Sequence, residues 1–227
     1  MNKVYAKYGI LVVPDILTNE QVSHYRVSLD SYLNFNASYK ECNNSKILPG
    51  FAGNTPELGT LNSLHLNKDI NSYLKNDIFG NNKFIYANHS DLHQNKTTSW
   101  HRDVYDYLMK DRGAGNQKDL WSNECHIIKV CFLLQDHINN EYGLWFQPGT
   151  HNSETEESNP IHLKTKATDM IIFNQRILHS GQTKEPKYHE VYNKNRYLIT
   201  YAYGLDNIHT KIHSKGAQLR QNRQIKT

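Results

Sequence analysis

The short motif His101-Arg102-Asp103 carries residue types that bind a hard metal ion. In an extended chain, residues two apart point to the same side. An imidazole and a carboxylate in this spacing therefore occupy two neighbouring positions on one metal, and a histidine from elsewhere can add the third. Two histidines and one carboxylate form a facial triad, which holds Fe(II) and leaves other positions open.

A second motif of the same type, His89-Ser90-Asp91, competes with the first. With 13 histidines in the chain, composition predicts about 0.7 His-x-Asp pairs by chance, so context must separate the two. We expect segment 89–96 to be a polar turn and segment 97–103 to be a strand. We therefore predict that His101 and Asp103 bind the metal and that His89 and Asp91 do not.

The elements that position these residues are mostly short, apolar strands. A helix is predicted from Thr18, which forms a capping box with Gln21, to about Asn34, and further helical content between 55 and 75. The predicted strands cover 8–13, 84–88, 97–103, 125–135, 143–147, 161–166, 170–173 and 196–203.

The run 125–135 is nearly continuously apolar, which is typical of a strand covered on both faces. Lys129 lies in its middle. Because burying an unpaired charge is costly, this lysine must reach the sheet edge or meet an anion.

Length and composition indicate one globular domain over residues 1–227, with 37% hydrophobic and 21% charged residues. The net charge is +4, and much of the excess lies in a basic C-terminal tail at about 207–227. We expect this tail to be solvated, so nucleic acid is not expected as a partner. Its basic residues are Lys211, Lys215, Arg220, Arg223 and Lys226.

The three cysteines, Cys42, Cys125 and Cys131, are odd in number and widely spaced. This pattern argues against a disulfide framework and against a zinc ribbon, and it favours a reducing, cytoplasmic compartment. We find no signal-peptide pattern and no apolar run long enough to span a membrane. The sequence does not indicate an oligomeric state.

The polar segment 106–123 is too long for an idle connection, so we predict a lid over a binding site. Together with the irregular segment 36–60, it is expected to contact the substrate. The lid candidate mixes aromatic and basic side chains that suit a polar or anionic metabolite, namely Tyr105, Tyr107, Lys110, Arg112 and Trp121.

Four segments, taken in order, resemble the phytanoyl-CoA dioxygenase-like family of Fe(II)/2-oxoglutarate-dependent oxygenases. They are Tyr-Gly-Ile-Leu-Val-Val-Pro-Asp at 8–15, Trp-His-Arg-Asp at 100–103, the stretch 143–151 ending Pro-Gly-Thr-His, and the stretch 173–181 ending Leu-His-Ser-Gly. The resemblance implies a mainly β protein with flanking helices and a double-stranded β-helix (jelly-roll, cupin-like) core.

The resemblance also implies site residues. It makes His101, Asp103 and His179 the catalytic iron ligands, and Arg196 the residue that holds the distal carboxylate of 2-oxoglutarate. Asn88 corresponds to a polar residue that contacts the cosubstrate in some members. The interval between His179 and Arg196 is longer than is usual in the family, through a predicted hairpin or loop inserted at 184–195. Lys129 is the reserve candidate for the cosubstrate.

Such a site implies three cofactors and cosubstrates: Fe(II), 2-oxoglutarate and O2. The expected reaction is hydroxylation of a small-molecule metabolite with release of succinate and CO2. Halogenation is not expected, because halogenases of this broad class have Ala or Gly where this chain has Asp103. Two alternatives remain open: a non-catalytic jelly-roll protein that binds a metal or ligand, and a nucleic-acid demethylase suggested only by the basic tail.

Overall fold

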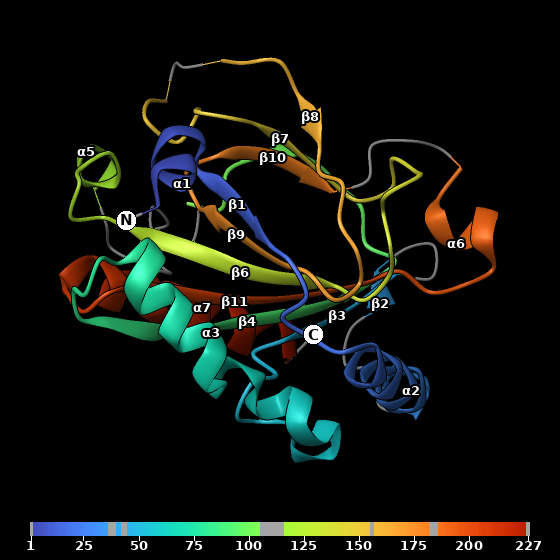
Figure 1. The fold of residues 1–227 in the computed structure, drawn as a ribbon. Coiled ribbons are helices and arrows are strands. Elements are labelled where there is room, and N and C mark those ends of the chain that lie inside the picture. Colours follow the sequence, from blue (N-terminus) through green and yellow to red (C-terminus); the bar gives the residue numbers. More distant parts are fainter. Residues whose placement is uncertain are drawn as a thin grey trace.

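Two antiparallel β-sheets face each other at the centre of the protein (Figure 1). The computed structural model describes residues 2–35, 40–41, 45–104, 116–154, 157–181 and 186–225. Within these residues, one sheet has seven strands in the order β1-β9-β6-β11-β4-β3-β2, and the other has four in the order β5-β10-β7-β8. The chain is thus mainly β with flanking helices, as predicted.

The strands are short, and most lie where the apolar segments of the sequence predicted them. The larger sheet consists of β1 (Ile10–Val13), β2 (Lys40–Glu41), β3 (Ser45–Pro49), β4 (Phe84–Gln94), β6 (Ile127–Leu133), β9 (Met170–Asn174) and β11 (Tyr197–Leu205). The smaller sheet consists of β5 (Thr98–His101), β7 (Leu144–Gln147), β8 (Ile161–His162) and β10 (Leu178–Gly181).

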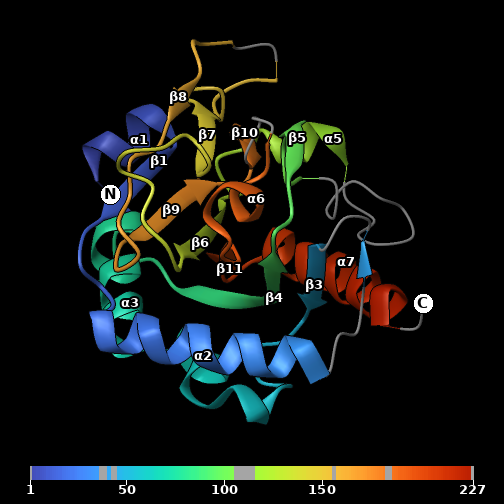
Figure 2. The ribbon, with the colours of Figure 1, turned by 90° about the vertical axis from the view of Figure 1, so that its right-hand side faces the viewer.

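Helices cover the outer side of the larger sheet, and α2 runs along it in Figure 2. The cap of α2 is the predicted capping box: the Thr18 N–H donates to the Gln21 side chain at 2.8 Å, and the Gln21 N–H donates to Thr18 Oγ1 at 3.1 Å. The helical elements are α1 (Lys3–Tyr8), α2 (Asn19–Phe35), η1 (Pro56–Leu66), α3 (Lys68–Tyr73), η2 (Leu74–Ile78), α5 (Gln117–Leu120), α6 (Tyr188–Tyr192) and α7 (Ile208–Ile225).

The buried apolar residues form a large cluster between the seven-stranded sheet and the helices, and a smaller one between the two sheets. In α2, the predicted face with Val22, Tyr25, Leu29 and Leu33 is buried in the large cluster. The space between the sheets is thus only partly filled by apolar side chains. This leaves room there for a polar site.

Strand β4 differs from the sequence prediction. We predicted a strand that ends at Asn88 and a turn over 89–96, but β4 continues to Gln94. The polar residues His89 and Asp91 are buried in this strand, with 2% and 3% of their surface exposed. They tolerate burial because they are bonded to one another and to α7, which a local pattern does not reveal.

The predicted solvated tail is also different in the structure. Residues 208–225 form the helix α7, which packs against β4 and β11. Its buried positions include His213 and Ala217, both with no exposed surface. The tail is therefore part of the folded body, because a row of small and polar residues at helical spacing packs on the sheet.

Parts of two predicted loops are described. In the insertion at 184–195, residues 188–192 form the helix α6 rather than a hairpin or loop, while 184–185 lie outside the described residues. The lid candidates at 105, 107, 110 and 112 also lie outside them, and Trp121 follows α5. In the portion that the structure covers, we find no helix of the length and apolarity that crossing a membrane requires.

Candidate metal centre

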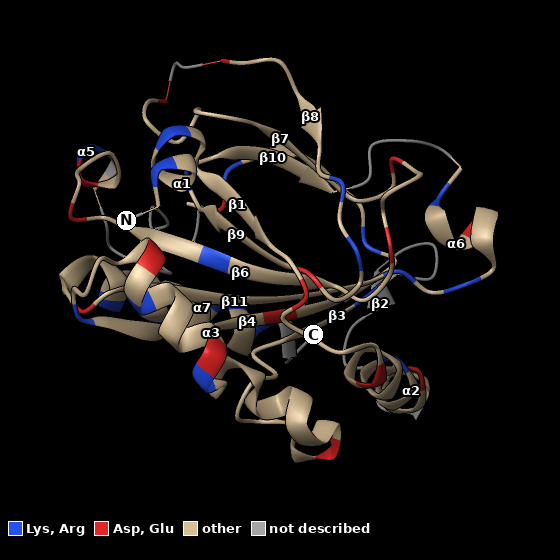
Figure 3. Cartoon of the chain, viewed as in Figure 1, with Lys and Arg blue, Asp and Glu red and all other residues tan. Residues whose placement is uncertain are grey.

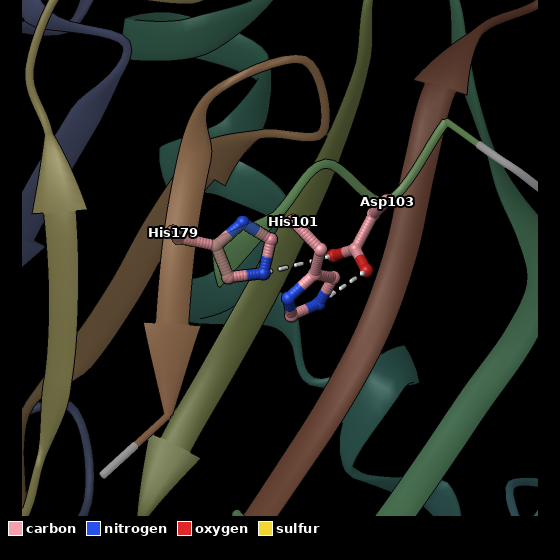
Figure 4. A group of neighbouring side chains, drawn as sticks. All are labelled: His101, Asp103 and His179. Carbon is pink, nitrogen blue, oxygen red and sulfur yellow. Dashed lines mark ion pairs between the residues drawn. The ribbon is translucent and has the colours of Figure 1, made fainter. Parts of the chain in front are cut away.

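Three predicted ligands meet between the sheets (Figure 4). His101 ends β5 and pairs in register with His179 of β10, while Asp103 follows two residues later. Asp103 Oδ1 lies 3.6 Å from His101 Nε2, and Asp103 Oδ2 lies 3.5 Å from His179 Nε2. The three ligand atoms all lie within 4.8 Å of one another, which is the arrangement that one metal ion needs.

Both imidazoles are held in the orientation that a metal ligand requires. Nδ1 of His101 lies 2.7 Å from the Ser99 carbonyl oxygen, and Nδ1 of His179 lies 3.0 Å from the Ile177 carbonyl oxygen. A carbonyl only accepts hydrogen bonds, so each Nδ1 carries the proton and each Nε2 keeps its lone pair. This second contact fixes the tautomer and the ring orientation.

Burial and charge set the protonation of these groups. Burial lowers the pKa of His179 to about 4, so this ring is neutral at neutral pH. Burial also lowers the pKa of His101, but the Asp103 carboxylate outweighs it and leaves the pKa above the usual value. Burial raises the pKa of Asp103, but Lys129 and the two histidines reverse this and hold it well below its usual range.

Of the two outcomes predicted for Lys129, the structure shows the second, in which the lysine meets an anion. It is the basic residue of β6 (blue in Figure 3), and its Nζ lies 3.0 Å from Asp103 Oδ2. The Lys129 side chain is 9% exposed. It is therefore the direct partner of a predicted metal ligand.

Arg196 is buried at the start of β11, with 1% of its surface exposed. Its Nε donates to the Tyr142 carbonyl oxygen at 2.9 Å, and its Nη1 donates to the Lys96 carbonyl oxygen at 3.0 Å. Nη2 is buried and has no hydrogen-bond partner among the described residues. Burial lowers the pKa of Arg196 to about 10, so the guanidinium is still charged at neutral pH.

The surroundings of Arg196 fit a carboxylate ligand. A side chain on Gly181 would begin 3.8 Å from Nη2, so the glycine keeps the approach to the guanidinium open. None of the described carboxylates forms an ion pair with Arg196, and an unsatisfied buried cation is costly. A guanidinium that offers N–H groups in one plane suits a carboxylate, which supplies both the charge and the acceptors.

One cavity of about 250 Å³ connects these groups. It contains the metal ligands, Lys129 and Arg196, and it extends to β4 and α7. Its lining is His89, Asp91, His93, Lys96, Thr98, His101, Arg102, Asp103, Lys129, Cys131, Leu144, Phe173, His179, Gly181, Arg196, Leu198, Thr200 and Arg220.

Asn88 does not join the site. It lies at an irregularity of β4 with a positive φ of 49°, and its amide donates to Ser214 Oγ at 3.3 Å on α7. It lines a separate depression together with residues of α7 and the segment after β3. Tyr86 and Ser90 line the same depression, whereas His89 and Asp91 line the cavity with the metal ligands, so we do not retain the predicted contact with a cosubstrate.

His89 and Asp91 line the same cavity but are arranged differently. Arg220 Nη2 lies 2.9 and 2.8 Å from the two Asp91 oxygens and 2.8 Å from His89 Nε2. His89 Nδ1 lies 3.0 Å from His213 Nε2, so this ring is occupied on both sides. Within the described residues, the three ligands His101, Asp103 and His179 are the group arranged to hold a metal.

Sequence reasoning missed Arg220, which lines the cavity, and His213, which contacts His89 behind it. The spacing of His213, Ala217 and Arg220 is helical and marks one face of α7. The absence of acids in this segment suggested a solvated tail instead. The acid that partners Arg220 is 129 positions away in the sequence.

Comparison with solved structures gives the fold class. The epimerase SnoN from nogalamycin biosynthesis, described as non-heme and α-ketoglutarate-dependent, matches with a TM-score of 0.66 and 15% identity over 88% of this chain and 79% of its own. HygX from Streptomyces hygroscopicus, with nickel and 2-oxoglutarate bound, matches with a TM-score of 0.64 and 14% identity over 89% and 85%. The fold is therefore the double-stranded β-helix, or jelly roll, as predicted.

A third structure, AviO1 from Streptomyces viridochromogenes Tue57, has a TM-score of 0.62 and 11% identity over 90% of this chain and 93% of its own. No protein-family model and no curated protein sequence matches the chain. The resemblance to the phytanoyl-CoA dioxygenase-like family therefore rests on the motifs quoted above.

Proposed function

We propose that this protein is an Fe(II)- and 2-oxoglutarate-dependent dioxygenase that hydroxylates a small-molecule metabolite. One observation carries the proposal: three metal-ligand atoms and a buried guanidinium without a carboxylate partner share one cavity. The first set fits a divalent metal, and the second fits the free carboxylate of a chelating cosubstrate. The similar structures SnoN and HygX support the proposal, since each is described with iron or nickel and 2-oxoglutarate.

Each residue has a distinct role in this proposal. His101 and His179 supply neutral nitrogen ligands through Nε2, and Asp103 supplies a carboxylate oxygen. Lys129 holds the second oxygen of Asp103. Bound Fe(II) with 2-oxoglutarate and O2 supplies a two-electron oxidation of a C–H bond, with release of succinate and CO2. The protein orients the reactants around three fixed ligands.

Arg196 binds the cosubstrate carboxylate through Nη2. Its Nε and Nη1 are already used by two backbone carbonyls, so the guanidinium cannot rotate away. The apolar side chains of Leu144 and Leu198 line the cavity on this side and suit the methylene groups of 2-oxoglutarate. A fixed positive charge in an apolar wall orients 2-oxoglutarate and favours it over ligands without a carboxylate at this position.

Asp103 favours hydroxylation over halogenation. A halogenase of this class needs a free coordination position where the carboxylate would be, and Asp103 occupies it here. A small-molecule substrate is supported by two similar structures, SnoN in complex with nogalamycin RO and HygX with hygromycin B bound. The reactions named for similar structures also include epimerisation and carbocyclisation, so the reaction type is tested directly.

The test begins with the purified protein, Fe(II) and 2-oxoglutarate without oxygen. We expect the absorption band of an iron–2-oxoglutarate chelate, absent in His179→Ala and in Arg196→Ala at low cosubstrate concentration. Oxygen should then produce succinate, even without the substrate. Binding of metal and 2-oxoglutarate without any succinate would favour the non-catalytic alternative.

Product analysis separates the reaction types. Small metabolites are screened for faster succinate release in the presence of excess chloride. The mass of the product is then measured by mass spectrometry. We expect a gain of one oxygen atom. A chlorinated product would contradict hydroxylation, and stimulation by oligonucleotides alone would favour the demethylase alternative.

A further inference from the structure

Five lysine and arginine side chains line the cavity, and three of them, Lys129, Arg196 and Arg220, differ in how their charge is balanced. Lys129 pairs with Asp103, and Arg220 pairs with Asp91 at 2.8 Å. Arg196 has no carboxylate partner among the described residues. A dianionic cosubstrate is therefore drawn to Arg196, while the charges near α7 are already matched within the protein.

The side of the cavity next to α7 is a continuous polar wall, which we call the α7 wall. It consists of His89, Asp91, Thr200 and Arg220. Thr200 Oγ1 donates to the Asp91 backbone oxygen at 3.3 Å, and Arg220 bridges both Asp91 carboxylate oxygens. Because the side chains brace each other, the wall keeps a fixed pattern of donors and acceptors.

The α7 wall lies apart from the predicted cosubstrate position. Arg196, directly before β11, and Leu198 and Thr200 within it all line this cavity, as residues two apart in an extended chain do. At about 3.3 Å per residue, Thr200 is roughly 13 Å along the strand from Arg196. A cosubstrate that extends from the metal toward Arg196 therefore does not reach the α7 wall.

We propose that the primary substrate binds against the α7 wall and that its contacting part is an uncharged, polyhydroxylated ring. This inference rests on the proposed function. A charged ligand would meet a group of its own sign in the Arg220–Asp91 pair. An acyl chain would remove water from a buried ion pair without replacing its hydrogen bonds, which is unfavourable. Hydroxyl groups both donate and accept, so they match Arg220 as donor and the Asp91 carboxylate as acceptor.

The experiment uses the full chain loaded with Co(II) and 2-oxoglutarate under nitrogen. The probes are myo-inositol and D-glucose as uncharged polyols, and octanoate as an acyl chain. The paramagnetic ion shortens the proton relaxation times of a probe bound beside it. We expect this effect for at least one polyol and not for octanoate, with the zinc-loaded protein as the diamagnetic control.

Variants then locate the binding site. Arg220→Met should weaken polyol binding at least tenfold while leaving 2-oxoglutarate binding within about twofold. Because this change leaves Asp91 unpaired, the charge-neutral double variant Asp91→Asn/Arg220→Met is measured beside it and should show the same loss. Arg223→Met, an exposed arginine on the same helix, is the matched control and should bind as the unmodified protein does.

The outcomes are distinguishable. If 2-oxoglutarate does not bind the cobalt-loaded protein, the proposed function fails. If 2-oxoglutarate binds and no polyol is relaxed, or octanoate is, the substrate inference alone is overturned. Polyol binding that persists in the folded double variant would place the substrate elsewhere in the cavity.

Discussion

The chain contains two His-x-Asp motifs on one cavity, and they behave as different chemical units. His101 and Asp103 face His179, and their ligand atoms converge on one point. His89 and Asp91 face His213 and Arg220, whose guanidinium lies against both side chains. The motifs are locally alike and each faces a histidine, so the difference comes from Arg220, which lies against the second motif. A histidine completes a metal site, whereas an arginine supplies the positive charge itself.

The largest expected effect is the difference in metal affinity between an alanine variant of the first motif and one of the second. His101→Ala removes a proposed metal ligand and should weaken Co(II) or Fe(II) binding by more than about 100-fold. Mutation of a residue that only hydrogen-bonds to a metal ligand already lowers metal affinity by about 10–100-fold. His89→Ala should leave the metal affinity within a few-fold of that of the unmodified protein. Titration calorimetry measures both. Loss of the metal in His89→Ala with retention in His101→Ala would reverse our assignment of the motifs.

The second prediction contrasts Arg196, which has no acidic partner among the described residues, with Lys129, which is paired with Asp103. Removing a charge-assisted pair should weaken 2-oxoglutarate binding by about 2–5 kcal/mol, measured by titration of the metal-loaded protein. Lys129→Met should not mimic this effect, since Lys129 contacts Asp103. If the cosubstrate affinity survives in Arg196→Ala and falls only in Lys129→Met, then Lys129 is the anchor.

The paired arrangement at α7 predicts a stability effect. Arg220→Met leaves the Asp91 carboxylate buried without its partner and should lower the free energy of unfolding by about 3 kcal/mol. The double variant Asp91→Asn/Arg220→Met restores neutrality and should recover much of this loss. Chemical denaturation of the four proteins in the cycle gives the coupling energy. Simple additivity of the two single changes would contradict the described pair.

The smallest expected effect concerns pH and the histidine behind the second motif. Burial holds the pKa of His213 well below its usual value, so the folded protein resists a proton that the unfolded chain accepts. Stability from this residue is complete above about pH 6.5 and falls by up to about 1.4 kcal/mol per unit as the pH drops below it. His213→Leu should show a shallower loss between about pH 6.5 and 5.5 in thermal unfolding. An identical slope in both proteins would mean that His213 is protonated in the fold.

These two regions also show what sequence alone can predict. The three residues that meet in the candidate metal centre were predicted together because His101 and Asp103 are close in sequence and the accompanying motifs kept a fixed order up to His179. The place of Lys129 in an apolar strand predicted that it reaches the sheet edge or meets an anion, and it meets Asp103. Such patterns are local or come in a known order, so they can be read without coordinates.

The second region depends on long-range contacts and was not predictable in this way. His89 and Asp91 were expected on a turn because they are polar, and Arg220 was expected in solvent because its neighbours are basic. Their partners lie 124 to 131 positions away. Asn88 lies on the side of β4 that carries Tyr86 and Ser90, away from the cavity lined by His89 and Asp91.

The helix α7 follows all the described strands in the sequence, so the residues of the cavity are synthesised in a fixed order. During synthesis, the strands with His101, Asp103, His179 and Arg196 leave the ribosome before Arg220 does. A chain cut by a protease near residue 207 would lose Arg220 but keep the residues proposed as metal ligands and as cosubstrate anchor. In the proposed function, trimming at this position would therefore separate cosubstrate binding from substrate binding within a single polypeptide.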